Sequence, residues 1–199
     1  MSRFQKYLHL LPLLCLVFSF APDPEISHNT NDDGYLVWGK RKLKWSDFQG
    51  EVPGDSEFHA LTHSAISLDF QGEGVILEFN IQTIFDPQKS WKKEGVNDYI
   101  LKHEQGHFDI TEYHARALRK KLKTHRYKSV ETIGDEVQNM FNEAYSRANQ
   151  MQILYDEQTK HSIDKKKQAK WDKKIKKLLS SLNTYKNPKV KVNVSYLNN

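Results

Sequence analysis

The sequence predicts one α+β domain, in which a small antiparallel sheet packs on a helix and two further helices complete the fold. Apolar and polar residues alternate over residues 64–85 around a glycine-containing turn, which is typical of a β-hairpin with one buried face. Apolar residues then recur at helical spacing in three later segments. The chain has 199 residues, enough for one domain with a proper core and too few for two.

The first residues are typical of a targeting signal. Two basic residues precede an almost wholly apolar run over residues 8–20, and Ser19-Phe20-Ala21 has the small residues that a signal peptidase recognises. We assign residues 1–21 to a signal peptide and predict an exported protein, periplasmic or extracellular, with no stable membrane insertion after cleavage. The alternatives are an uncleaved anchor, although the run is short for a membrane span, and lipid attachment at Cys15.

Composition limits the chemistry of any site. Cys15 is the single cysteine, so a chain cleaved after Ala21 has no thiol, and a metal must be held by His, Asp or Glu. The formal net charge is +5, but the excess lies on lysine-rich helix faces without interleaved base-reading groups. We therefore predict no nucleic-acid partner.

The elements before the hairpin are short. Residues 22–34 are polar and turn-rich and predict a flexible leader. A short strand is expected over 35–38 and a second over 42–45, followed by a turn in which Ser46 or Asp47 acts as a cap.

Three helices follow the hairpin. The first is capped by Asn97 or Asp98 and runs to about residue 124, and the second covers about 129–155. A third begins after a capping Ser162 and carries most of the lysines. We place the domain boundary at residue 182, so that residues 35–182 form the domain. Residues 183–199 form a C-terminal tail, in which 189–196 alternates either as an edge strand or as a frayed end.

The first helix carries the pattern H-E-x-x-H at His103, Glu104 and His107. On a helix, two histidines four residues apart lie on one face and can share a metal ion. Glu104 then lies beside the ion without binding it, where a carboxylate can take a proton from an activated water. Gly106 is unfavourable in a helix by roughly 1 kcal/mol against Ala, which suggests that a neighbouring strand or a substrate needs the space.

A catalytic zinc site usually has three protein ligands, and the third must come from another element. The polar segment 155–162 is expected to be a loop between the second and third helices, and His161 is the first choice of ligand, with Asp156 and Glu157 in reserve. Tyr155 is a candidate to stabilise a developing oxyanion. Asp109, Glu112 and Asp156 are candidates to accept hydrogen bonds from the metal-binding histidines. The remaining histidines lack ligand spacing and are expected to be surface or structural: His28, His59, His63 and His125.

These elements resemble a known family. Its motifs are similar to the run His103-Glu104-Gln105-Gly106-His107-Phe108-Asp109-Ile110, to Thr159-x-His161-Ser162, to Gln168-x-x-Trp171, and to residues 43–50. The family is the bacterial domain of unknown function 922, described as predicted zinc-dependent proteases. The resemblance covers about residues 36–179 and implies a zincin-like catalytic domain outside the cytoplasm, without indicating a substrate.

The predicted function is a zinc-dependent metallopeptidase. His103, His107 and His161 would hold Zn²⁺, and Glu104 would act as general base for the zinc-activated water and then protonate the leaving amine. The partner would be a peptide or protein, added as a strand at the edge of residues 75–85. The main alternative is a non-catalytic, zinc-stabilised binding module of the cell envelope. A second is a basic helical protein that binds an anionic surface through the lysine-rich third helix.

Overall fold

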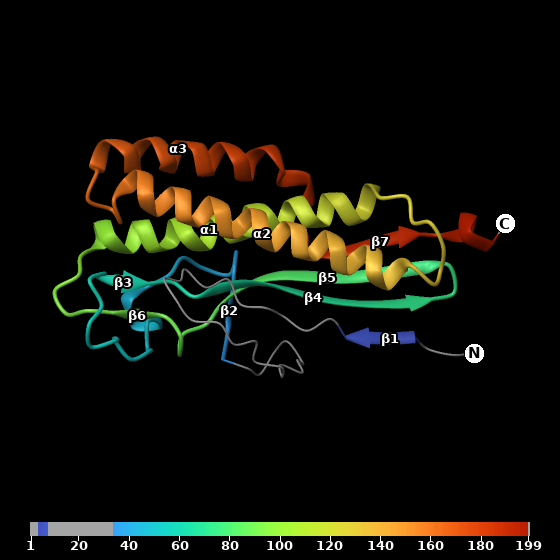
Figure 1. Cartoon of the computed structure of the whole chain (residues 1–199), viewed down its shortest axis with the longest axis horizontal. Coiled ribbons are helices and arrows are strands. Elements are labelled where there is room, and N and C mark those ends of the chain that lie inside the picture. The colour runs from blue at the N-terminus through green and yellow to red at the C-terminus, as the bar shows by residue number, and fades with distance from the viewer. Residues whose placement is uncertain (1–3, 8–33, 199) are drawn as a thin grey trace.

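The computed structural model describes residues 4–7 and 34–198, and these form an α+β fold in which two helices lie on one face of an antiparallel sheet and a third helix packs on these two (Figure 1). The predicted signal peptide and leader lie outside the described residues, apart from Gly34 and the strand β1 (Phe4–Tyr7). Within the described residues, no helix combines the length and apolar character needed to cross a lipid bilayer.

The hairpin is the centre of the main sheet. It consists of β4 (Ser64–Glu73) and β5 (Ile76–Phe85), which pair over their full length, as the alternation predicted. On its other side β5 pairs with β2 (Leu36–Val37) at one end and with β7 (Lys189–Asn193) at the other, and β1 pairs with β4. Because β5 has neighbours on both sides, it offers no free edge to which a peptide strand could add.

A second, two-stranded sheet lies next to the hairpin. It pairs β3 (Ala60–Leu61) with β6 (Trp91–Lys92). The strand predicted over 42–45 is absent, because this segment leads into a short 3₁₀ helix, Trp45–Asp47. The Asp47 carboxylate accepts the Lys44 amide at 2.7 Å, which is a turn geometry that competes with strand pairing.

The first helix, α1 (Asp98–Thr124), has the predicted bounds. Its cap is Asn97, whose side-chain oxygen accepts the backbone N–H groups of Tyr99 and Ile100 at 3.0 and 3.1 Å. These bonds satisfy two of the amides that the first turn of a helix leaves without partners.

The second helix, α2 (Ile133–Thr159), begins and ends four residues later than predicted. Val130 fits the apolar period but lies in the preceding turn and is exposed. At the other end, the polar residues after Tyr155 form a last helical turn that faces α1. The Thr159 hydroxyl closes this turn by donating to the Tyr155 carbonyl at 2.7 Å.

The third helix, α3 (Lys165–Ser181), is capped by Asp164, which accepts the Lys167 amide. The predicted cap Ser162 lies two residues earlier. It belongs to a connection in which Lys160, His161 and Ser162 all have positive φ, of 50°, 51° and 73°. L-residues rarely adopt this conformation, so the connection is a defined turn that fixes where His161 points.

The main core lies between the sheet and one side of α1 and α2. The last turns of α1 and the first turns of α2 pack on the inward-facing residues of β4 and β5. A smaller cluster joins α1 to the end of α2 and to α3, through Ile110, Tyr155, Trp171 and Ile175. These two clusters hold the first half of α1 against the end of α2, and the candidate site lies there.

The C-terminal segment is folded onto the domain in its described part. Val190 and Val192 of β7 are buried in the main core, and β7 pairs with residues 76–80 of β5. Of the two alternatives for 189–196, the edge strand is therefore found. The expected tail from residue 183 contributes to the sheet.

Candidate metal site

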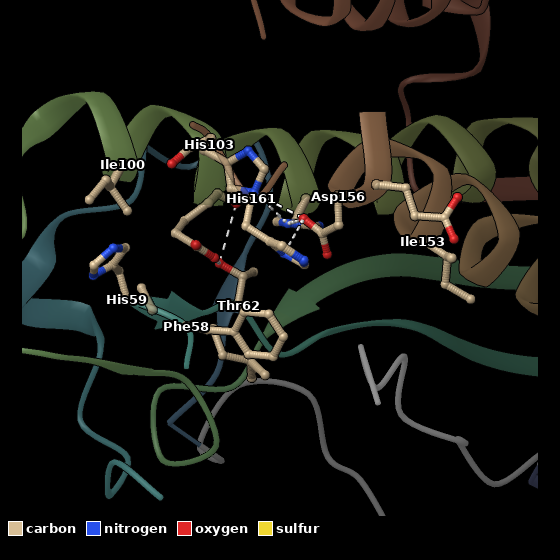
Figure 2. A pocket seen from close by; sticks show the side chains of 14 residues that line it. Phe58, His59, Thr62, Ile100, His103, Ile153, Asp156 and His161 are labelled. Carbon is tan, nitrogen blue, oxygen red and sulfur yellow. Dashed lines mark hydrogen bonds and ion pairs between the residues drawn. The ribbon is translucent and has the colours of Figure 1, made fainter. Parts of the chain in front are cut away.

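Two buried histidines face each other on α1. His103 and His107 are 3% and 5% exposed, and their Nε2 atoms are 3.2 Å apart, as expected for residues one turn apart on one helix face. Figure 2 shows His103 turned toward Asp156, which comes from the last turn of α2.

Asp156 completes a triangle of ligand atoms. Its Oδ1 atom lies 3.0 Å from the Nε2 atoms of both His103 and His107. Bonds from zinc to nitrogen and oxygen are about 2.0–2.1 Å long, so two ligand atoms of a tetrahedral ion are about 3.3 Å apart. The observed spacing is close to that value. Among the described residues, the grouping with ligand geometry is His103, His107 and Asp156.

Two glutamines fix the protonation of the histidine rings. The Gln152 amide nitrogen donates to the His107 carbonyl at 2.9 Å, which leaves its oxygen, 2.6 Å from His107 Nδ1, to accept. The Gln168 amide nitrogen likewise donates to Asp172, and its oxygen lies 2.9 Å from His103 Nδ1. Both Nδ1 atoms therefore carry a proton, so the Nε2 atom of each ring, which lies beside Asp156, is the atom available to a metal ion.

This set of donors fits a divalent metal ion. Three electron-rich atoms at 3.0–3.2 Å repel each other unless positive charge lies between them. Burial alone would raise the pKa of the Asp156 carboxyl, but the charge of His107 and hydrogen bonds from His103, His107 and His161 lower it below its ordinary value. Asp156 is therefore an anion. One proton can join only two of the three atoms, whereas a metal ion can bind all three.

The structure favours Asp156, one of the reserves, over His161 as the third ligand. His161 Nδ1 lies 3.6 Å from Asp156 Oδ1, and the His161 side chain is 49% exposed. Its ring packs against Phe58 with 4.5 Å between ring centroids. His161 thus faces Asp156 from outside the triangle and forms part of the wall beside the ion position. The other reserve, Glu157, also lies in the wall.

Glu104 has the position expected of a base. It is buried and outside the ligand triangle, and its Oε2 atom accepts the Thr62 hydroxyl at 2.8 Å. The same hydroxyl lies 3.3 Å from the Glu104 carbonyl. Thr62 follows β3, so the chain beside the sheet holds the carboxylate against the pocket.

Tyr155 is fully buried and does not line the pocket, so the structure does not place its hydroxyl where it could contact an oxyanion formed there. Its ring lies under the histidines, with 4.5 Å between its centroid and that of His103. Burial raises the pKa of its phenol well above the ordinary value, so the hydroxyl keeps its proton. This hydroxyl donates to the His103 carbonyl at 3.2 Å and accepts from Gln168 at 2.6 Å. Tyr155 therefore supports the histidine face from below.

The same ring explains Gly106. A Cβ atom at this position would lie 2.3 Å from the Tyr155 hydroxyl oxygen and 2.9 Å from its Cζ atom. The space that the sequence assigned to a strand or a substrate is thus occupied by a tyrosine of α2.

We expect Gly106→Ala to destabilise the protein by about 1–3 kcal/mol through overpacking, although alanine is favoured over glycine in a helix by roughly 1 kcal/mol. Chemical denaturation measures the change. Adding Tyr155→Phe removes the closest clashing atom and should recover part of the loss. A Gly106→Ala protein more stable than wild type would contradict this packing.

Two of the expected hydrogen-bond partners of the histidines have other contacts. Asp109 accepts from Trp38 Nε1 at 2.7 Å and from the Gln105 amide at 2.8 Å. Glu112 is buried with Arg116 and Arg119. The partners are instead Gln152 and Gln168, for which the sequence predicts no role in the site. Gln152 could have been found, because it lies four residues before Asp156 on the buried stripe of α2.

Replacing either glutamine should weaken metal binding without removing a ligand. Loss of such a partner typically lowers metal affinity by about 10–100-fold, so we expect this range for Gln152→Leu and for Gln168→Leu in competition with a chromophoric chelator. Gln158→Leu is the control, because Gln158 bonds Trp171 and neither histidine. An unchanged affinity in both site variants would contradict the assigned role.

A pocket of about 280 Å³ opens beside the triangle. Its walls come from the chain before β4, from α1 and from the end of α2 (Figure 2). His59 also lines it, although its lack of ligand spacing had suggested a surface or structural role. The lining residues are Phe58, His59, Ala60, Leu61, Thr62, Ile100, His103, Glu104, His107, Ile153, Asp156, Glu157, His161 and Ser162.

Comparison with known proteins supports the family resemblance and adds no activity. No curated protein and no solved structure matches the chain. Residues 83–162, which include both helices that form the triangle, match the family described as "Bacterial protein of unknown function (DUF922)".

Proposed function

We infer that the protein is a metal-dependent hydrolase of the zincin type that cleaves peptide bonds, exported as its N-terminal pattern suggests. The observation that carries this inference is the convergence of His103, His107 and Asp156 next to a buried carboxylate that is not a ligand. A structural site needs no such carboxylate, since its ligands fill the coordination shell. Here three ligands and an adjoining pocket leave room for water and substrate.

The chemistry divides between the ion and the chain. A zinc ion held by the three residues would act as a Lewis acid that polarises a carbonyl and lowers the pKa of water toward neutrality. Glu104 accepts a proton from the attacking water and returns it to the leaving nitrogen, a role typically worth about 10²–10⁴ in rate. Thr62 holds the carboxylate in place, with its hydroxyl 2.8 Å from Oε2.

We assign to His161 the stabilisation of the developing oxyanion, which the sequence predicts for Tyr155. His161 lines the pocket next to Asp156, on the α2 side of the ion position. From this position a ring N–H can donate to the carbonyl oxygen as negative charge develops there. Its left-handed turn and its contact with Phe58 hold the ring in place.

The substrate runs past β3. Among the described residues, β3 pairs with β6 on one side and has no strand on its other side, and Ala60 and Leu61 line the pocket. An extended peptide can add there by backbone hydrogen bonds, as in other cases of strand addition. This replaces the edge of the hairpin as the binding edge.

The test is cleavage of a denatured protein by zinc-loaded enzyme, followed by mass spectrometry of the products. The expected fragments each end at a hydrolysed peptide bond, disappear with chelator and return when zinc is added. A protein that binds one zinc ion per chain and cleaves no peptide under any of these conditions would rule out the hydrolase. In that case the site would support the binding module, whose thermal midpoint responds to chelator without turnover.

A further inference from the structure

The pocket beside the metal site has apolar walls on both sides of the ligands. On one side Ile100 of α1 lies near the chain around β3, and on the other Ile153 projects from α2 (Figure 2). His103 and Asp156 lie between them. Phe58 and Leu61 extend the apolar lining, and both are half-buried. The metal-binding groups lie between these apolar side chains, and the polar residues His59 and Glu157 also line the pocket.

The exposure of Ile153 is unusual for a large apolar side chain. It is 53% exposed, and of the two exposed large apolar residues of α2, Ile153 and Leu154, it is the one that lines the pocket. Helix α2 has room for a polar residue at this surface, as at Glu157 one turn later. An apolar side chain that borders a reactive site and remains open to solvent indicates contact with a ligand.

We propose that the pocket binds two apolar side chains of a polypeptide, one on each side of the scissile bond. The first packs against Ile100 and Leu61, and the second against Ile153. This inference rests on the proposed hydrolase function and adds the substrate class, which is a polypeptide segment with bulky aliphatic or aromatic residues at the cleaved bond. Such segments are buried in folded proteins, so the natural substrates would be unfolded or extended chains.

The position of the peptide follows from the geometry. A peptide paired with β3 has successive side chains about 3.3 Å apart along the strand and pointing alternately to opposite faces. The two residues around one peptide bond therefore point in different directions. Ile100 and Ile153 lie on opposite sides of the ligands, which matches this divergence.

The test measures binding separately from cleavage. The probes are two fluorescein-labelled peptides of equal length and charge, one with Leu-Leu and the other with Ser-Ser at the centre. They are titrated into the zinc-loaded Glu104→Gln protein. Because even partial burial removes apolar leucine surface from water, the Leu-Leu peptide should bind about tenfold or more tightly.

Substitutions in the two pocket walls test which residues cause the preference for the Leu-Leu peptide. Ile153→Ser should reduce the ratio between the two peptides by about threefold or more, and Ile100→Ser should do the same. Val130→Ser is the matched control, because Val130 is 54% exposed and precedes α2 at the end far from the pocket. Since Ile153 is half exposed, its replacement leaves folding intact, and an unchanged thermal midpoint verifies this.

Equal binding of the two peptides, or equal effects of Ile153→Ser and Val130→Ser, would overturn the inference. Wild-type cleavage of both peptides with the same kcat/KM would also overturn it, while the hydrolase function would stand. Preferential binding of the Leu-Leu peptide with no cleavage by wild type would have the opposite meaning. The apolar subsites would then be supported and the hydrolase function would fall.

Discussion

Glu104→Gln is expected to lower kcat for peptide hydrolysis by about 10²–10⁴-fold while the protein keeps its metal. The amide has the shape of the carboxylate and its oxygen can still accept the Thr62 hydroxyl, so the pocket should keep its form. It cannot accept a proton from water, and the rate should fall by the contribution of a general base. Metal content should not change, because Glu104 lies outside the ligand triangle.

The control for this variant is Glu157→Gln. Glu157 lines the same pocket but is exposed and is not one of the three converging ligands. We expect a change in kcat of severalfold at most. Steady-state kinetics on one peptide, with zinc content measured on the same samples, compares the two variants. A Glu104→Gln enzyme with wild-type kcat would exclude Glu104 as the base.

Glu112→Gln is expected to destabilise the fold by about 3–5 kcal/mol. The Glu112 carboxylate is 2% exposed and accepts from Arg116 at 2.8 Å and from Arg119 at 2.9 Å. It also accepts the Thr83 hydroxyl from β5 at 2.8 Å. Removing its charge leaves two buried guanidinium groups without a counter-ion, which is far more costly than losing an ion pair in water.

The matched control is Glu143→Gln. Glu143 of α2 also pairs with two basic residues, Lys121 and Arg147, but its side chain is 42% exposed. Exposed pairs are typically worth about 0–1 kcal/mol. Denaturant unfolding with chelator present measures both variants without a contribution from metal binding. Equal losses of stability in the two variants would contradict the structural importance of the buried cluster.

The periodic parts of the fold could be predicted from the sequence. The alternation over 64–85 identified the hairpin, and the helical period identified α1, including its cap and its end. Both signals arise because one face of each element is buried against the same core. The short strand β3 has only two residues, too few for any alternation to show.

The end of α2 differs from the prediction because its polar residues face another helix. A polar segment usually indicates a loop, but Gln152 and Asp156 are polar because they contact the histidines of α1. This functional requirement overrides the apolar pattern of a buried helix face. For this reason the sequence favours His161, which lies in the connection after α2, over Asp156 as the ligand.

The pairing of Gln168 with His103 could not be derived from spacing. The two residues are 65 positions apart and meet only because Trp171 and Ile175 pack α3 against α1 and α2. Likewise, Gly106 has a helix-breaking character in the sequence, and only the fold shows that Tyr155 fills the space beside it. Contacts between faces of separate helices require the packing to be known.

Zinc content per chain, measured by elemental analysis after reconstitution and removal of free metal, tests the proposed site most directly. The samples are wild type, Asp156→Ala and His161→Ala. We expect close to one zinc ion in wild type and in His161→Ala, and a loss of nearly all zinc in Asp156→Ala, because Asp156 supplies one of the three converging atoms. Retention of zinc in Asp156→Ala together with its loss in His161→Ala would contradict the ligand set, and absence of zinc from wild type would contradict the metal site altogether.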